Sequence, residues 1–66
     1  MLSYHARLSL EYFASQPRPD QTPATLARIV RHVAFTYAMP PASTASLLSE
    51  ATAEAQRRGL VRKEVA

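Results

Sequence analysis

The sequence predicts an all-α fold: one three-helix domain over residues 1–66, with a short C-terminal extension or a vestigial wing strand. Two observations predict this class. Apolar residues recur at three- and four-residue spacings in three segments, as one face of an α-helix requires. Prolines cluster at 16–23 and 39–43, and the residue before a proline avoids helical geometry, so these clusters separate the three segments.

The size of the chain limits how it can be stabilised. At 66 residues there is room for one small domain, and the chain contains no cysteine. A domain of this size buries only about 60% of the surface that its unfolded chain exposes. Disulfides and thiolate metal sites are excluded, so we expect close helix packing or self-association, most simply a homodimer, to support the fold.

The first helix is expected over about residues 2–15. One helical stripe contains Leu2, Ala6, Leu10 and Phe13, and a second contains Tyr4, Leu8 and Tyr12. Because two stripes make a wider apolar surface than one buried face needs, this helix is expected to contact two neighbours.

The second helix is expected over about residues 23–38. Thr22 is a suitable N-cap, and Pro23 suits the first helical position, where its missing N–H is not needed. Five apolar positions fall within roughly a 100° arc and predict the centre of the core: Leu26, Ile29, Val30, Val33 and Tyr37. The helix should end at or just before Met39, because Pro40 follows.

The third helix is expected over about residues 44–58, capped by Ser43 or Thr44. Its apolar positions are Leu47, Leu48, Ala51 and Ala55. Gly59 suits the left-handed position that ends many helices, and Leu60 should then fold back on Ala55. The following residues, from Val61, fit a short edge strand or an unpaired extension equally well.

The sequence contains no pattern typical of a catalytic or metal site. His5 and His32 are far apart in the chain, and the single glycine leaves no phosphate-binding loop, so we expect no enzyme activity, no metal and no cofactor. Glu50 and Glu54 are four residues apart, a spacing that serves acid–base chemistry only within a cleft. We expect both on a solvated face, with Glu54 paired to Arg58.

Phe35 is the residue that fits a simple helical pattern least well. On the second helix it falls opposite the core stripe, between Arg28 and Arg31. Exposed aromatic groups bordered by charge often mark interfaces. Three arrangements remain open: the ring packs under the second stripe of the first helix, it forms a homodimer contact, or it contacts a protein or nucleic-acid partner.

Residues 43–64, STASLLSEATAEAQRRGLVRKE, resemble the recognition helix and wing entry of winged helix-turn-helix regulators, especially the MarR-like group. In that family the start of the helix enters the major groove, and the basic turn and wing approach the DNA backbone. The resemblance implies groove contacts by Ser43, Thr44 and Ser46, and phosphate contacts by Arg57, Arg62 and Lys63.

Charge and hydropathy narrow the function classes. The net charge of +3, with seven arginines among eight basic residues, favours an anionic partner. No segment predicts a membrane span or a secretory signal, so we expect a cytoplasmic protein. The first hypothesis is a non-enzymatic DNA-binding transcriptional regulator. The alternative is a small inhibitor or adaptor, as phages and mobile elements encode, that binds a host protein through Arg28, Arg31 and Phe35.

Overall fold

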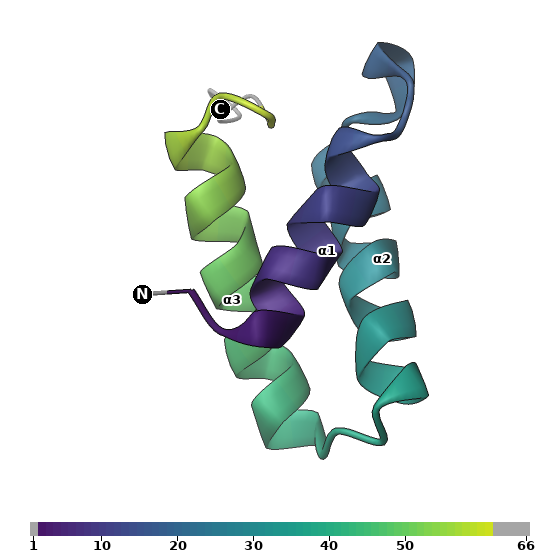
Figure 1. The fold of residues 1–66 in the computed structure, drawn as a ribbon, viewed down its shortest axis with the longest axis vertical. Helices are drawn as coiled ribbons and strands as arrows, with labels where there is room; N and C mark the ends of the chain where they lie inside the picture. The colour runs from purple at the N-terminus through teal and green to yellow at the C-terminus, as the bar shows by residue number, and fades with distance from the viewer. Residues whose placement is uncertain (1, 62–66) are drawn as a thin grey trace.

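The computed structural model describes residues 2–61 and confirms the all-α class. It contains three α-helices and a short 3-10 turn, with no strand in this part of the chain (Figure 1). The elements in order are α1 (Tyr4–Ala14), η1 (Arg18–Asp20), α2 (Pro23–Thr36) and α3 (Pro41–Arg57).

Each of the three helices packs on the other two. In Figure 1, α1 crosses in front of α2 and α3. The turn between α2 and α3 lies at one end of the molecule, and η1 and the last turn of α3 lie at the other. The two ends of the molecule therefore present different residues to a binding partner.

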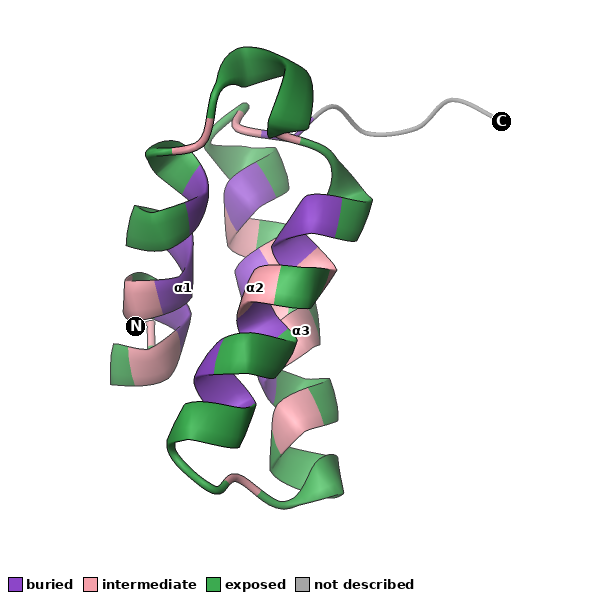
Figure 2. Ribbon diagram, turned by 90° about the vertical axis from the view of Figure 1, so that its right-hand side faces the viewer, coloured by how far each residue is buried: buried purple, intermediate pink, exposed green. Residues whose placement is uncertain are grey.

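The core is built from the helical stripes that the spacing predicts, and their buried faces turn toward one another (Figure 2). Its buried residues are Ala6, Leu10, Phe13, Leu26, Val30, Val33, Leu47, Ala51, Ala55 and Val61. Leu2, Ile29 and Leu48 pack against this core and are partly buried. Tyr37 was predicted as a core position, but its side chain is 46% exposed because it lies at the C-cap of α2, beyond the last buried turn.

Both α1 and α2 begin at a hydroxyl cap. Ser3 accepts a hydrogen bond on its side-chain oxygen from the Ala6 N–H, at 3.2 Å, so α1 begins two residues later than predicted. Thr22 accepts one from the Thr25 N–H, also at 3.2 Å, with Pro23 in the first turn. The predicted start of α2 is confirmed.

The end of α2 lies at Thr36, two residues before the predicted position 38. Ala38 adopts a left-handed conformation with φ of 53°, and the Met39 N–H donates to the Ala34 carbonyl at 2.9 Å. This is the geometry of a Schellman cap, with alanine where glycine is usual. The cap therefore ends α2 before the chain reaches Pro40.

The predicted start of α3 is wrong. The helix begins at Pro41, with Pro40 as the N-cap residue, and not at 44 after a cap by Ser43 or Thr44. Proline suits the first helical position because its φ is already helical and no N–H partner is needed there. Ser43 and Thr44 consequently lie within the first turn, where the Thr44 hydroxyl donates to the Pro40 carbonyl at 3.0 Å.

The end of α3 follows the prediction. Gly59 is left-handed, with φ of 73°, and the Leu60 N–H donates to the Ala55 carbonyl at 2.9 Å. Val61 then inserts into the core and is 2% exposed. The rest of the predicted C-terminal extension or wing strand, including Arg62 and Lys63, lies outside the described residues.

Candidate functional site

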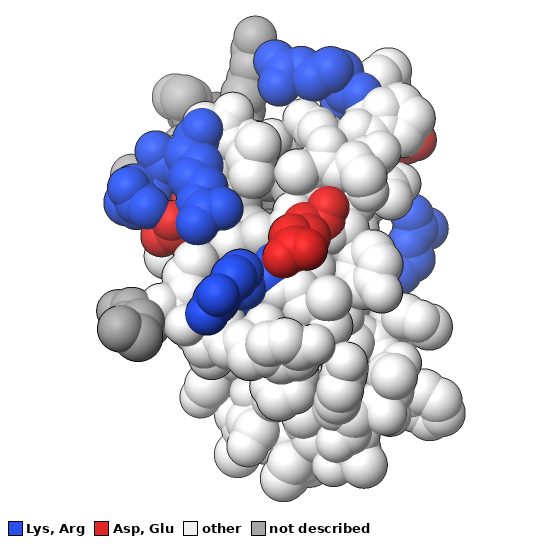
Figure 3. All heavy atoms as spheres, in the orientation of Figure 1, with Lys and Arg blue, Asp and Glu red and all other residues white. Residues whose placement is uncertain are grey.

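The charged side chains are unevenly distributed along the molecule. Residues 33–49 contain no Lys, Arg, Asp or Glu. They form the last turn of α2, the α2–α3 turn and the first half of α3. Figure 3 accordingly shows one end of the visible face free of charged atoms, while charged groups gather toward the other end. The uncharged end is the more suitable one for apolar contacts.

Phe35 stands at this end, in an exposed position. Phe35 is 85% exposed, so of the arrangements left open by the sequence, the one in which the ring packs under the first helix is wrong. Tyr37 occupies the place beside α1, with its ring centroid 6.3 Å from that of Tyr4 and 4.7 Å from that of His5. The physical reason is helical rotation: Tyr37 continues the stripe of Val33 one turn on, whereas Phe35 points away from it.

An apolar groove of about 430 Å³ lies beside Phe35, between α2 and α3. Its lining, which we call the α2–α3 groove, comprises Val30, Arg31, Ala34, Phe35, Met39, Pro41, Thr44, Ala45 and Leu48. Val30 and Ala34 are buried beneath it, and Leu48 and Met39 are partly buried. The groove thus has an apolar floor, with Phe35 and Arg31 exposed on its α2 side.

The three predicted partner-binding residues lie on the exposed side of α2. Arg28, Arg31 and Phe35 are spaced by three and four residues, so they occupy neighbouring turns of one face. The α3 side of the groove was not predicted. Its signal was present, since Pro41, Ala45 and Leu48 also follow helical spacing beside the core stripe.

Glu50 was predicted to lie on a solvated face, but its carboxylate is bound by the first residues of the neighbouring helix α1. Its carboxylate accepts hydrogen bonds from the Ser3 backbone N–H, at 2.8 Å, and from the Ser3 hydroxyl, at 2.9 Å. Since Ser3 is the N-cap of α1, the Glu50 carboxylate lies at the positive end of that helix. The pair fastens the start of α1 to the middle of α3.

Glu54, in the last turn of α3, forms ion pairs, and the predicted pairing with Arg58 is confirmed. The Arg58 Nε lies 2.6 Å from a Glu54 carboxylate oxygen, and Arg57 donates to the same carboxylate through two nitrogens. Hydrogen bonds from Arg57 and Arg58 and their positive charge lower the pKa of Glu54 from 4.5 to about 2. The side chains of Arg57 and Arg58 remain 70% and 42% exposed.

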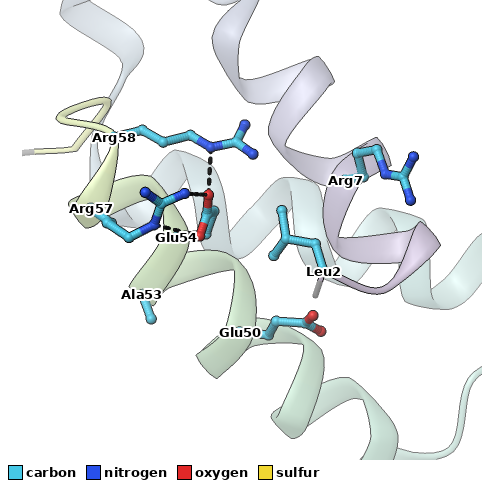
Figure 4. A pocket seen from close by; sticks show the side chains of 7 residues that line it. All are labelled: Leu2, Arg7, Glu50, Ala53, Glu54, Arg57 and Arg58. Carbon is cyan, nitrogen blue, oxygen red and sulfur yellow. Dashed lines mark hydrogen bonds and ion pairs between the residues drawn. The ribbon is translucent and has the colours of Figure 1, made fainter.

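A hollow of about 650 Å³ lies between this ion-pair group and α1. In Figure 4, Arg57 and Arg58 point toward Glu54, while Arg7 lies across the hollow on α1. Three cations and two carboxylates line the site, together with Leu2 and Ala53. Because the carboxylates balance most of the positive charge, this hollow has no strong preference for an anion.

The residues that the resemblance assigns to DNA are spread along α3. Ser43, Thr44 and Ser46 lie in its first turns and Arg57 in its last, roughly 20 Å away at about 1.5 Å per residue. Glu50 lies between the two groups, hydrogen-bonded to Ser3. Arg62 and Lys63 lie outside the described residues, so two of the three assigned phosphate contacts are not placed.

Residues 2–61 hold no group of three or more metal-ligating side chains. His5 is packed against Tyr37, and His32 is exposed on α2. Within the same range, none of the helices has the combination of length and apolar character that a bilayer span requires.

Comparison with protein-family models, with curated proteins and with solved structures gave no match to this chain. The resemblance to winged helix-turn-helix regulators therefore rests on residues 43–64 alone.

Proposed function

We propose that this protein is a non-enzymatic protein-binding module whose contact surface is centred on Phe35. The observation that carries the proposal is the 85% exposure of the Phe35 side chain at the edge of the apolar α2–α3 groove. Burying an exposed phenylalanine in an interface contributes about 1.5–3 kcal/mol. An isolated exposed ring is common, but an exposed ring beside an apolar groove with a cationic border is typical of interaction sites.

The rest of the molecule supports the same function. The core is complete without Phe35, so this ring is not needed to hold the helices together. The groove lies on α2 and α3, whose positions are set by their buried stripes and by caps at both ends of α2. A contact surface on rigid elements loses little conformational entropy on binding.

Site-specific photo-crosslinking tests the proposal. A photoreactive phenylalanine analogue is placed at position 35 of the full chain, expressed in its own cell, and the matched control carries it at Tyr12, an exposed aromatic position on α1. We expect a discrete protein adduct from position 35 that position 12 does not form. Absence of any adduct specific to position 35, or adducts with nucleic acid in place of protein, would contradict the proposal.

DNA binding through α3 is a second candidate, favoured by the exposure of Ser43, Ser46 and Arg57. Duplex binding of this kind weakens steeply as salt rises, because phosphate contacts release condensed counterions. Titration of duplex DNA at low ionic strength, with Arg57→Ala as the phosphate-contact variant and Phe35→Ala as the control, distinguishes the candidates. The DNA candidate predicts that Arg57→Ala weakens binding and Phe35→Ala does not.

A further inference from the structure

We propose that the α2–α3 groove binds an acidic amphipathic helix of a partner protein. The inference rests on the proposed function and specifies the occupant of its surface. Phe35 and Leu48 contact the apolar stripe of that helix, and Arg31, with Arg28 one turn further along α2, pairs with carboxylates beside the stripe.

The shape of the site favours a helix as the occupant. The groove lies between two helices and is lined by α2, α3 and their connecting turn. Side chains of a third helix fit between two packed helices as ridges fit into grooves. Ala34 and Ala45 are small, so they permit close approach of a helix backbone. Strand addition requires an exposed sheet edge, and the described residues contain no strand.

The charges at the site determine the kind of helix. Between Asp20 and Glu50 the sequence contains no acidic residue, so α2 and the first half of α3 contribute no carboxylate to this surface. The formal charges of α2 are those of Arg28 and Arg31, both exposed. Arginine pairs with carboxylates in a bidentate geometry, which favours glutamate or aspartate beside the apolar stripe of the partner.

The same charges disfavour a second copy of this chain as the occupant. In a two-fold symmetric dimer each subunit contributes the same surface to the contact. Two α2–α3 grooves placed face to face would bring Arg28 and Arg31 of both copies together, with no carboxylate from this surface to balance them. A partner with acidic flanks removes that repulsion.

Designed peptides test the inference on the purified full chain. The first is a helical peptide of roughly 20 residues, long enough to form a helix, with leucines at one helical stripe and glutamates beside it. The second has lysine in place of every glutamate. Binding is measured by fluorescence anisotropy at low and moderate salt, against the wild type, Phe35→Ala and Arg31→Glu. Tyr12→Ala is the matched control because this aromatic side chain is also exposed but lies on α1.

We expect the acidic peptide to bind and the lysine peptide not to bind. Phe35→Ala should weaken binding about thirtyfold, the effect of losing a central interface side chain, and Tyr12→Ala should leave it unchanged. Arg31→Glu should weaken binding of the acidic peptide and strengthen binding of the lysine peptide. Added salt should weaken binding of the acidic peptide, because salt screens the charge pairs between the peptide and the protein.

Three results would overturn the inference: equal binding of both peptides, binding of neither, or binding of the acidic peptide that Phe35→Ala and Arg31→Glu leave unchanged. Self-association to a mass near twice 7.3 kDa, abolished by Phe35→Ala, would assign the groove to a second copy instead. If position 35 crosslinks to a partner protein while neither peptide binds, the proposed function stands and the acidic-helix inference falls.

Discussion

Glu50, in the middle of α3, accepts two hydrogen bonds from Ser3, the N-cap of α1, at 2.8 and 2.9 Å. The two residues are far apart in sequence and join the first turn of the chain to the last helix. Ser3 also caps its own helix by accepting from the Ala6 N–H. One side chain thus serves both the start of α1 and its attachment to α3.

Loss of this contact should destabilise the fold. Glu50→Ala removes the carboxylate from a solvent-exposed cap N–H and hydroxyl, which water can then bind, so we expect the free energy of unfolding to fall by about 0.5–1 kcal/mol. Urea unfolding measures the change, with Glu11→Ala on the exposed face of α1 as the control. In a double-mutant cycle with Ser3→Ala, the loss of stability in the double variant should be smaller than the sum of the losses in the two single variants. Additive losses would show that the two residues are not coupled.

The Glu54 group predicts a specific dependence of stability on pH. The folded protein keeps Glu54 ionised down to about pH 2, whereas the unfolded chain takes up the proton near its ordinary value of 4.5. The unfolded state therefore binds more protons in this window, and stability rises with pH across it. The contribution of ionised Glu54 to stability is complete above about pH 4.5 and is lost as the pH falls toward 2.

Comparison of Glu54→Gln with the wild type isolates that contribution. Denaturant unfolding across the acid range should show a smaller rise of stability with pH in the variant, and the two proteins should converge at the acid end. Added salt should reduce the difference, because the side chains of Arg57 and Arg58 are both accessible to solvent. An unchanged pH profile in Glu54→Gln would contradict the assigned pKa.

The two left-handed helix ends predict opposite effects of exchanging glycine and alanine. Ala38 adopts φ of 53° and Gly59 adopts φ of 73°. A side chain at such a position costs about 1 kcal/mol, so Gly59→Ala should destabilise by about that amount although its Cβ would meet no neighbouring atom. Ala38→Gly should stabilise by about 0.5 kcal/mol, since relief of strain is partly offset by the freer unfolded chain. Thermal unfolding of both variants tests the signs.

The two phenylalanines should separate folding from binding. Phe13 is fully buried in the core, so Phe13→Ala should cost about 3–5 kcal/mol and leave little folded protein. Phe35 is 85% exposed, so Phe35→Ala should change the stability by less than about 0.5 kcal/mol. Circular dichroism and thermal unfolding measure both. A large loss of stability in Phe35→Ala would show that the ring supports the fold or a dimer.

Much of the fold is predictable because it depends on local physics. The stripes that end at Phe13, Val33 and Ala55 identify the buried faces, and Gly59 identifies the end of α3. Errors arise where two local signals compete. Around Pro40 and Pro41, proline at the first helical position prevails over the hydroxyl caps at Ser43 and Thr44.

The candidate site was predictable only in part. Spacing along α2 identified Phe35, Arg28 and Arg31, but a single helix does not specify which neighbour covers which of its faces. The neighbouring surface on α3, with Ala45 and Leu48, becomes part of one groove only when the helices pack together.

The sequence by itself determined three helices, their core stripes and the uncharged segment 33–49, because these properties depend on residues within one or two turns of each other. The tertiary structure decided that Tyr37 lies beside α1, that Phe35 remains exposed and that Glu50 binds Ser3. The reason is physical: each depends on how one helix is rotated and placed against another, and that arrangement is set by the packing of the whole core.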